Sequence, residues 1–149
     1  MCMTPDFTAG GLLPPGIHSV SRSELRARFG GTPVRSQILA GIFRAADALR
    51  VAGCQWLWID GSFATIKGQP GDWDGCWDPS GVDRKLLDPL LMDFSPQGRA
   101  RMKVKYLADL FPSTWIEQSS SSTFLNYFQI DKATGLPKGV LVLNLRDIS

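Results

Sequence analysis

The chain has one histidine, three cysteines and no long apolar run, and each shortage excludes a class of protein. Because His18 is alone and lies in a segment rich in proline and glycine, most serine–histidine mechanisms and metal sites built from several histidines are excluded. Cys2, Cys54 and Cys76 are odd in number and widely separated, which excludes a disulfide framework and a zinc knuckle. No apolar run approaches the roughly 20 residues that a membrane-spanning helix needs.

The net charge is also small, since 16 basic and 14 acidic residues leave only +2. Such a balance does not argue for general affinity to nucleic acid or membrane surfaces. Asp6 and the lack of a basic residue ahead of Leu12 are unlike a secretory signal peptide, so we expect a cytoplasmic protein with no membrane partner. At 149 residues with 44% hydrophobic content, we expect a single domain over residues 1–149 with an irregular N-terminal arm of about residues 1–17.

The segment from Gly61 to Asp74 carries most of the chemistry. The dipeptide Gly61-Ser62 is followed after nine residues by Asp72 and Asp74, which are spaced i, i+2. Ahead of it, Gln55 to Ile59 is apolar on both faces and predicts a strand that is covered on both sides. On a following strand, alternation would place Asp72 and Asp74 on one face. Two neighbouring carboxylates repel each other and are commonly reconciled by a divalent cation, so this pattern predicts a metal site.

A calcium loop, a propeller blade and a plain hairpin are the rival structures for this acidic segment. A calcium EF-hand loop starting at Asp72 would need glycine at its sixth position, where this chain has Trp77, and the two Trp-Asp dipeptides recur too closely for propeller blades. A plain hairpin stays open as an alternative, because residues 68–72 have turn composition and an aspartate there often bonds the backbone. Ser62 could equally act only as a cap for the short segment 63–67.

Capping residues and periodicity predict the remaining elements. Strong caps are Ser21 with Glu24 three residues later, Thr32 before Pro33, and Ser95 before Pro96. The predicted elements are helices over 21–29, from 33 to a stop at 53, from near 88, from 96 and from 124 after the cap Thr123, and strands over 107–111 and 138–145, with a polar loop over 119–122. Their order predicts an α/β (α+β) fold with a mixed sheet and helices chiefly on one face.

Two side-chain stripes allow two interpretations each. The helix from residue 96 carries four basic residues, which form either a solvated face or a phosphate-binding surface: Arg99, Arg101, Lys103 and Lys105. Phe124, Tyr127 and Phe128 are spaced as one helical face, which is more typical of a core than of a base-stacking platform. Cys76 would share the face of Asp74, where a buried thiol is its expected role.

The stretch from residue 55 to 74 resembles the signature of the polymerase-beta-like nucleotidyltransferase superfamily, in particular its minimal members. That signature is a hydrophobic strand, Gly-Ser, about ten residues and then Asp-hydrophobic-Asp. The superfamily has a third carboxylate on a later strand, and Asp109 is the candidate here. The segment Leu13 to Gly16 is in addition similar to the start of a group of small bacterial proteins.

The resemblance implies a catalytic site in which Asp72, Asp74 and Asp109 hold two Mg²⁺ ions, or Mn²⁺. Gly61, Ser62 and Lys67 would bind the phosphates of a nucleoside triphosphate such as ATP. The implied reaction moves a nucleoside monophosphate to a hydroxyl of a protein or RNA acceptor.

The chain departs from the superfamily pattern in two ways. No arginine follows Gly61-Ser62, and Asp60 adds a negative charge that could instead hold the turn together. The implied setting is a toxin–antitoxin or phage-defence pair with an operon-encoded partner protein. The alternatives are a catalytically inactive, antitoxin-like binding module with a nucleotidyltransferase fold, and an RNA-binding protein that uses the basic stripe.

Overall fold

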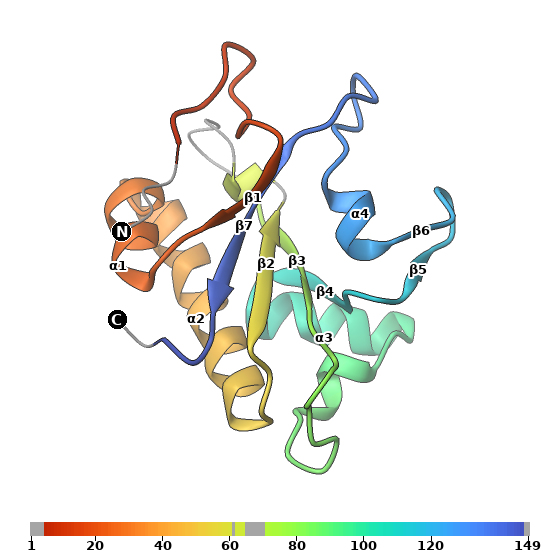
Figure 1. Ribbon diagram of the computed structural model, residues 1–149. Helices are drawn as coiled ribbons and strands as arrows, with labels where there is room; N and C mark the ends of the chain where they lie inside the picture. Colours follow the sequence, from red (N-terminus) through yellow and green to blue (C-terminus); the bar gives the residue numbers. More distant parts are fainter. Residues whose placement is uncertain (1–4, 61, 65–70, 148–149) are drawn as a thin grey trace.

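The computed structural model describes residues 5–60, 62–64 and 71–147, with only the backbone of Ser62 (Figure 1). Strands and helices alternate along this part of the chain in an irregular order. The elements are β1 (Gly16–Ser19), α1 (Arg22–Glu24), η1 (Leu25–Phe29), α2 (Pro33–Val51), β2 (Trp56–Asp60), η2 (Ser62–Ala64), β3 (Trp73–Trp77), η3 (Pro89–Met92), α3 (Pro96–Tyr106), β4 (Ala108–Pro112), β5 (Ile116–Glu117), β6 (Ser122–Thr123), α4 (Phe124–Phe128) and β7 (Gly139–Asn144).

Within the described residues, five strands form one mixed sheet in the order β1-β7-β2-β3-β4. Strand β2 is antiparallel to both β3 and β7, whereas β1 pairs parallel with β7 and β4 pairs parallel with β3. Helix α3 makes the crossover that a parallel β3–β4 pair needs. The expected α+β fold with a mixed sheet is confirmed.

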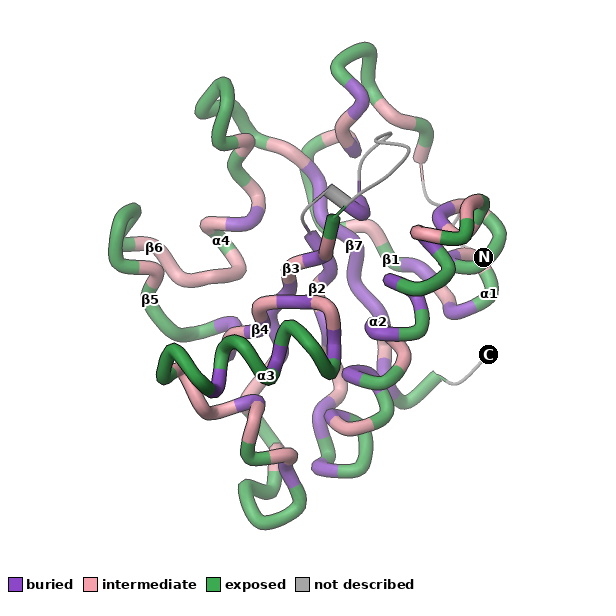
Figure 2. The backbone as a smooth tube through the Cα atoms, turned by 180° about the vertical axis from the view of Figure 1, so that it is seen from behind, coloured by how far each residue is buried: buried purple, intermediate pink, exposed green. Residues whose placement is uncertain are grey.

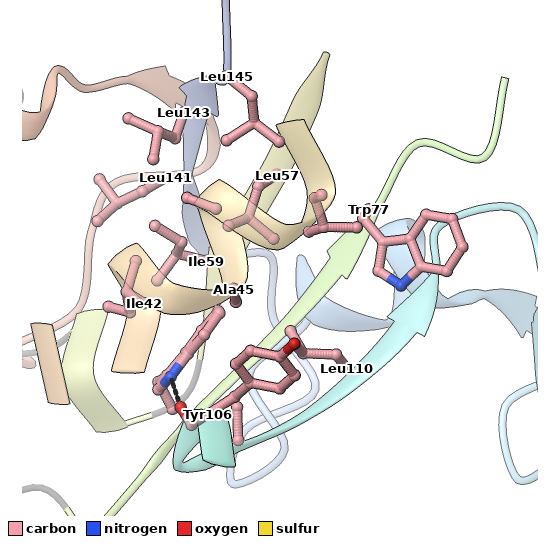
Figure 3. Close-up of a cluster of buried hydrophobic side chains, with 14 of the residues drawn as sticks. Ile42, Ala45, Leu57, Ile59, Trp77, Tyr106, Leu110, Leu141, Leu143 and Leu145 are labelled. Atoms are coloured by element: carbon pink, nitrogen blue, oxygen red, sulfur yellow. Dashed lines mark hydrogen bonds between the residues drawn. The ribbon is translucent and has the colours of Figure 1, made fainter. Parts of the chain in front are cut away.

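Helices α2 and α3 cover one face of the sheet and enclose the main core, as Figure 2 shows from behind. Ile42 and Ala45 of α2 are fully buried and meet Leu57, Leu141 and other strand residues in the cluster of Figure 3. The helices approach closely because residue 41 is glycine, since a β-carbon there would collide with the carbonyl oxygen of Tyr106. This packing fixes where α3 and the strand after it lie.

A smaller cluster lies on the opposite face, under α4. Cys76 of β3 and Val140 of β7 are both fully buried there and pack with Phe128 of α4, while Phe111 and Phe124 are partly buried beside them. Cys76 is therefore the buried free thiol that its position in the strand predicted. The aromatic stripe of α4 belongs to this cluster, as expected for core residues.

Local signals located most helix starts correctly. Ser21 and Glu24 form the predicted capping box, and Thr32 and Ser95 accept hydrogen bonds from the amides of Arg35 and Gly98. The segment predicted as one helix over 21–29 divides into α1 and the π-helical turn η1. Strand positions are within about two residues of those predicted.

Two short pairings differ from the expectation. The irregular arm expected over residues 1–17 overlaps the edge strand β1, which covers residues 16–19, and the preceding Leu13 is only 1% exposed. Around the serine-rich run, β5 and β6 form a small antiparallel hairpin in place of a plain loop. Among the described residues, no helix has the length and apolar character to cross a membrane.

Candidate functional site

Three aspartates occupy matching positions in three adjacent strands. Asp60 ends β2 and is the register partner of Asp74 in β3, which is in turn the register partner of Asp109 in β4. Cys76 and Phe111 follow two residues after Asp74 and Asp109 and pack in the small cluster under α4. Because side chains alternate along a strand, the three carboxylates project from that same face. We refer to Asp60, Asp74 and Asp109 as the acidic row.

Basic side chains of α3 meet the carboxylates on one side of this row. The Nζ atom of Lys103 lies 2.7 Å from Oδ2 of Asp72 and 3.3 Å from Oδ2 of Asp109. Nη2 of Arg99, one helical turn earlier, lies 3.4 Å from the same Asp109 oxygen. The hydrogen bond to Asp72 raises the pKa of Lys103, with Asp109 adding to it and burial opposing it. The repulsion expected around Asp72 is thus relieved by a lysine 31 positions away.

The other end of the row is held by Lys138, just ahead of β7. Its Nζ donates a hydrogen bond of 2.6 Å to Oδ1 of Asp60. Asp60 is only 4% exposed, and the ion pair with Lys138 offsets part of the cost of burying its carboxylate. Asp60 therefore has a structural partner outside the turn that it was expected to hold together.

The central carboxylate of the row, Asp74, differs from Asp60 and Asp109, which both have an ion-pair partner. Among the described residues, no hydrogen bond or ion pair reaches it. Burial raises the pKa of Asp74 to about 6, and the charges of Asp72, Asp60 and Asp109 contribute, whereas Lys132 acts in the opposite direction. Burial and three neighbouring carboxylates thus favour the protonated form of Asp74, and a bound cation would favour the ionised form.

Asp74 and Asp109 line a cavity of about 320 Å³ between the sheet and the α4 region. One wall is aromatic, with the rings of Phe111 and Phe124 stacked at a centroid distance of 4.0 Å. Lys132 lies with its Nζ 5.0 Å from the ring centroid of Tyr127. The full lining consists of Asp74, Arg99, Asp109, Phe111, Ile116, Glu117, Gln118, Phe124, Tyr127, Phe128 and Lys132. The cavity thus combines a carboxylate floor, two cationic groups and apolar walls.

The donor set suits a hard divalent cation such as Mg²⁺, because every candidate ligand is a carboxylate oxygen. The unpartnered Asp74 fits a bound cation best. Among the described residues, however, no three acidic, histidine or cysteine side chains converge closely enough to enclose an ion, and Asp72 and Asp109 are directed at Lys103. The carboxylate oxygens are chemically suited to a metal ion. The ammonium of Lys103 now lies between two of them, those of Asp72 and Asp109.

The predicted site residues are placed unequally. Asp74 and Asp109 are register partners, and Lys103 lies between Asp72 and Asp109 at the same end of the sheet, but within the described residues the three predicted ligands do not form a close cluster. Gly61 and Lys67 lie outside the described residues, and Ser62 is described only as the first residue of η2.

The sequence indicated the basic stripe of α3 as a solvated face or a phosphate-binding surface, but not its contact with the carboxylates. The spacing of Arg99 and Lys103 at i, i+4 indicates a shared helix face, but nothing in the chain shows that this face meets carboxylates. The roles of Lys132 and Lys138 had no local signal at all.

The chain belongs to a family of unknown function, DUF6932, whose family model matches residues 5–144. No curated protein and no solved structure matches the chain.

Proposed function

We propose that this member of the DUF6932 family is a metal-dependent nucleotidyltransferase that moves a nucleoside monophosphate from a triphosphate to a hydroxyl of a protein or RNA. The observation that carries the proposal is the acidic row, with Asp74 lacking a partner among the described residues at the floor of a cavity. A carboxylate kept in such surroundings destabilises the protein unless it binds a cation. Asp72, Asp74 and Asp109 would hold Mg²⁺ or Mn²⁺.

The bound cations would neutralise the triphosphate and help to activate the acceptor hydroxyl. Arg99 and Lys132, which line the cavity, are suited to contact phosphate oxygens through their positive charges. Phe111, Phe124 and Tyr127 form an apolar wall of the cavity that is suited to pack beside the nucleoside part of the substrate. Gly61, Ser62 and Lys67, which follow β2 in the sequence, remain the other proposed phosphate contacts.

Titration calorimetry with each nucleoside triphosphate, in Mg²⁺ and in chelator, tests the proposal. We expect binding that requires Mg²⁺ and is lost in Asp74→Asn. Asp83→Asn is the matched control, because within the described part of the chain the only hydrogen bond to the side chain of this exposed aspartate comes from the local amide of Lys85, and the asparagine can keep that bond. If no triphosphate binds with Mg²⁺ at millimolar concentration, the enzyme proposal fails.

A second function, a non-catalytic binding module, is favoured by one observation. Lys103 and Arg99 already neutralise Asp72 and Asp109, as in a fold that has no further use for metal. Such a module would bind its partner protein equally well with Mg²⁺ or with chelator, and Asp74→Asn would not weaken that complex. The calorimetric experiment therefore separates the two functions.

We further propose a cytoplasmic protein that works with a partner encoded in the same operon, as in toxin–antitoxin or phage-defence pairs. The RNA-binding alternative has less support, because Arg99, Lys103 and Lys105 each pair with a carboxylate of the chain itself. That leaves Arg101 as the basic residue of the α3 stripe without an ion pair among the described residues.

A further inference from the structure

Lys103 occupies an unusual position for a surface lysine. Its ammonium group bridges Asp72, at 2.7 Å, and Asp109, at 3.3 Å; Asp72 immediately precedes β3, and Asp109 lies in the neighbouring strand β4. Both carboxylates belong to the proposed metal ligands. The ammonium therefore stands in the space that a shared divalent cation would enter.

The side chain is tethered and yet able to leave. Its helix, α3, is anchored by the buried residues Met102 and Tyr106, so the backbone at Lys103 is held against the core. The lysine side chain itself is 45% exposed, and its four-carbon stem allows the ammonium to turn into solvent without moving the helix. Arg99 contacts Asp109 at 3.4 Å and would keep one positive charge in place when Lys103 departs.

The charges also favour an exchange. A single ammonium between two carboxylates is a weaker counter-ion than a divalent cation that can also bind Asp74, whose carboxylate has no ion-pair partner among the described residues. A competing ammonium at a half-exposed site is nevertheless always present at high effective concentration, since it is part of the chain.

We propose that Lys103 is an intramolecular lock that competes with the divalent cation for Asp72 and Asp109. In the metal-free protein the Lys103 ammonium lies between the two carboxylates. Metal binding displaces this ammonium into solvent. The inference rests on the proposed metal site, and it adds a regulatory contact that sets the metal concentration at which the site fills.

Manganese binding to the full chain, measured by the loss of the electron paramagnetic resonance signal of free Mn²⁺, tests the lock. Lys103→Met keeps the apolar stem and removes the charge, so we expect Mn²⁺ affinity to rise about fivefold to tenfold relative to the wild type. Arg101→Met is the matched control, because it makes the same change in net charge on the same helix from a residue that no ion pair joins to the acidic row among the described residues. Its affinity is expected to equal that of the wild type, and Asp74→Asn is expected to lose binding.

The outcomes separate the lock from the metal site. Equal or weaker Mn²⁺ binding by Lys103→Met, with binding still lost in Asp74→Asn, overturns the lock and leaves the proposed function standing. An equal rise in Lys103→Met and Arg101→Met also overturns it, since the cause would then be net charge. Absence of Mn²⁺ binding at millimolar concentration in all four proteins overturns the metal site and the lock together. Lys103→Gln and a thermal melt of each variant guard against a folding defect.

Discussion

Asp88, between α3 and η3, and the acidic row around Asp74 are two places where the same kind of side chain has opposite surroundings. Asp88, before η3, accepts hydrogen bonds from Lys105 at 2.7 Å, from the Leu90 amide at 3.1 Å and from the Tyr106 hydroxyl. Burial acts to raise the pKa of Asp88, but the bonds from Lys105, Tyr106 and Leu90 outweigh it and lower that pKa. Asp74 receives no such donor from the described residues, and its pKa is raised to about 6.

The difference separates a carboxylate that stabilises the fold from one that burdens it. A carboxylate with three donors contributes to stability, as Asp88 does between α3 and η3. A carboxylate among like charges lowers stability when it is ionised, and perturbed carboxylates of this kind are typical of functional sites. The comparison makes Asp88 a structural residue and Asp74 the functional candidate.

The largest expected effect is at the satisfied carboxylate. Asp88→Ala removes the acceptor of the buried Tyr106 hydroxyl and of Lys105, so the free energy of unfolding should fall by about 2–3 kcal/mol. Urea unfolding at pH 7 measures this change, with Asp83→Ala as the exposed control. A loss below about 0.5 kcal/mol would show that Asp88 is as dispensable as a surface residue.

A mutation in the acidic row is expected to raise the free energy of unfolding instead of lowering it. Asp74→Asn removes one of several repelling charges and should raise the stability of the metal-free protein by about 1 kcal/mol. Thermal melting in chelator, beside Asp83→Asn, measures it. A clear drop in melting temperature would mean that Asp74 is a structural hydrogen-bond acceptor, as in the plain hairpin.

The two groups should also respond oppositely to pH. The pKa of Asp74 is raised from 3.8 to about 6, so its destabilising charge develops as pH rises through this range, and the advantage of Asp74→Asn should vanish below about pH 4. The pKa of Asp88 is lowered, so its contribution is full above its ordinary value and is lost as pH falls. Melting temperatures of the wild type, Asp74→Asn and Asp88→Asn in chelator are to be measured between about pH 2 and about pH 7.5. The difference due to Asp74 should change between about pH 4 and about pH 6, and the difference due to Asp88 should change below about pH 4. Parallel curves for all three proteins would contradict both assignments.

The smallest change in stability is expected for Arg101, which contacts neither Asp88 nor the acidic row through an ion pair among the described residues. Arg101 lies on α3 and is exposed, so Arg101→Ala should change stability by less than about 0.5 kcal/mol. Filter binding of RNA across a salt series should likewise give the same slope of log affinity against log salt for the wild type and for Arg101→Ala. A slope of log affinity against log salt that shrinks by about one would revive the RNA-binding alternative.

Elements with local signals could be predicted from the sequence, and elements that depend on distant pairing could not. The caps Thr32 and Ser95 and their following prolines located α2 and α3, because capping acts within one helical turn. Strand β1 escaped prediction, since Gly16–Ser19 has little strand character and gains its hydrogen bonds from β7, near the other end of the chain.

The candidate site likewise has a part that the sequence could predict and a part that it could not. Asp72, Asp74 and Asp109 could be grouped from strand order and alternation, because register repeats every two residues. The contact of Lys103 with two of them follows from how α3 packs beside the edge strand β4, which no local pattern reports.

By itself the sequence determined the acidic spacing, the helix caps and the α+β character, since these follow from interactions between near neighbours along the chain. Only the tertiary structure decided that Asp60 joins Asp74 and Asp109 in one row, and that Lys138 and Lys103 hold the carboxylates on its two sides while Asp74 has no ion pair within the described chain. The reason is electrostatic and geometric. The pKa of a carboxylate depends on every charge within a few ångströms, and these neighbours come from strands and helices far apart in the sequence.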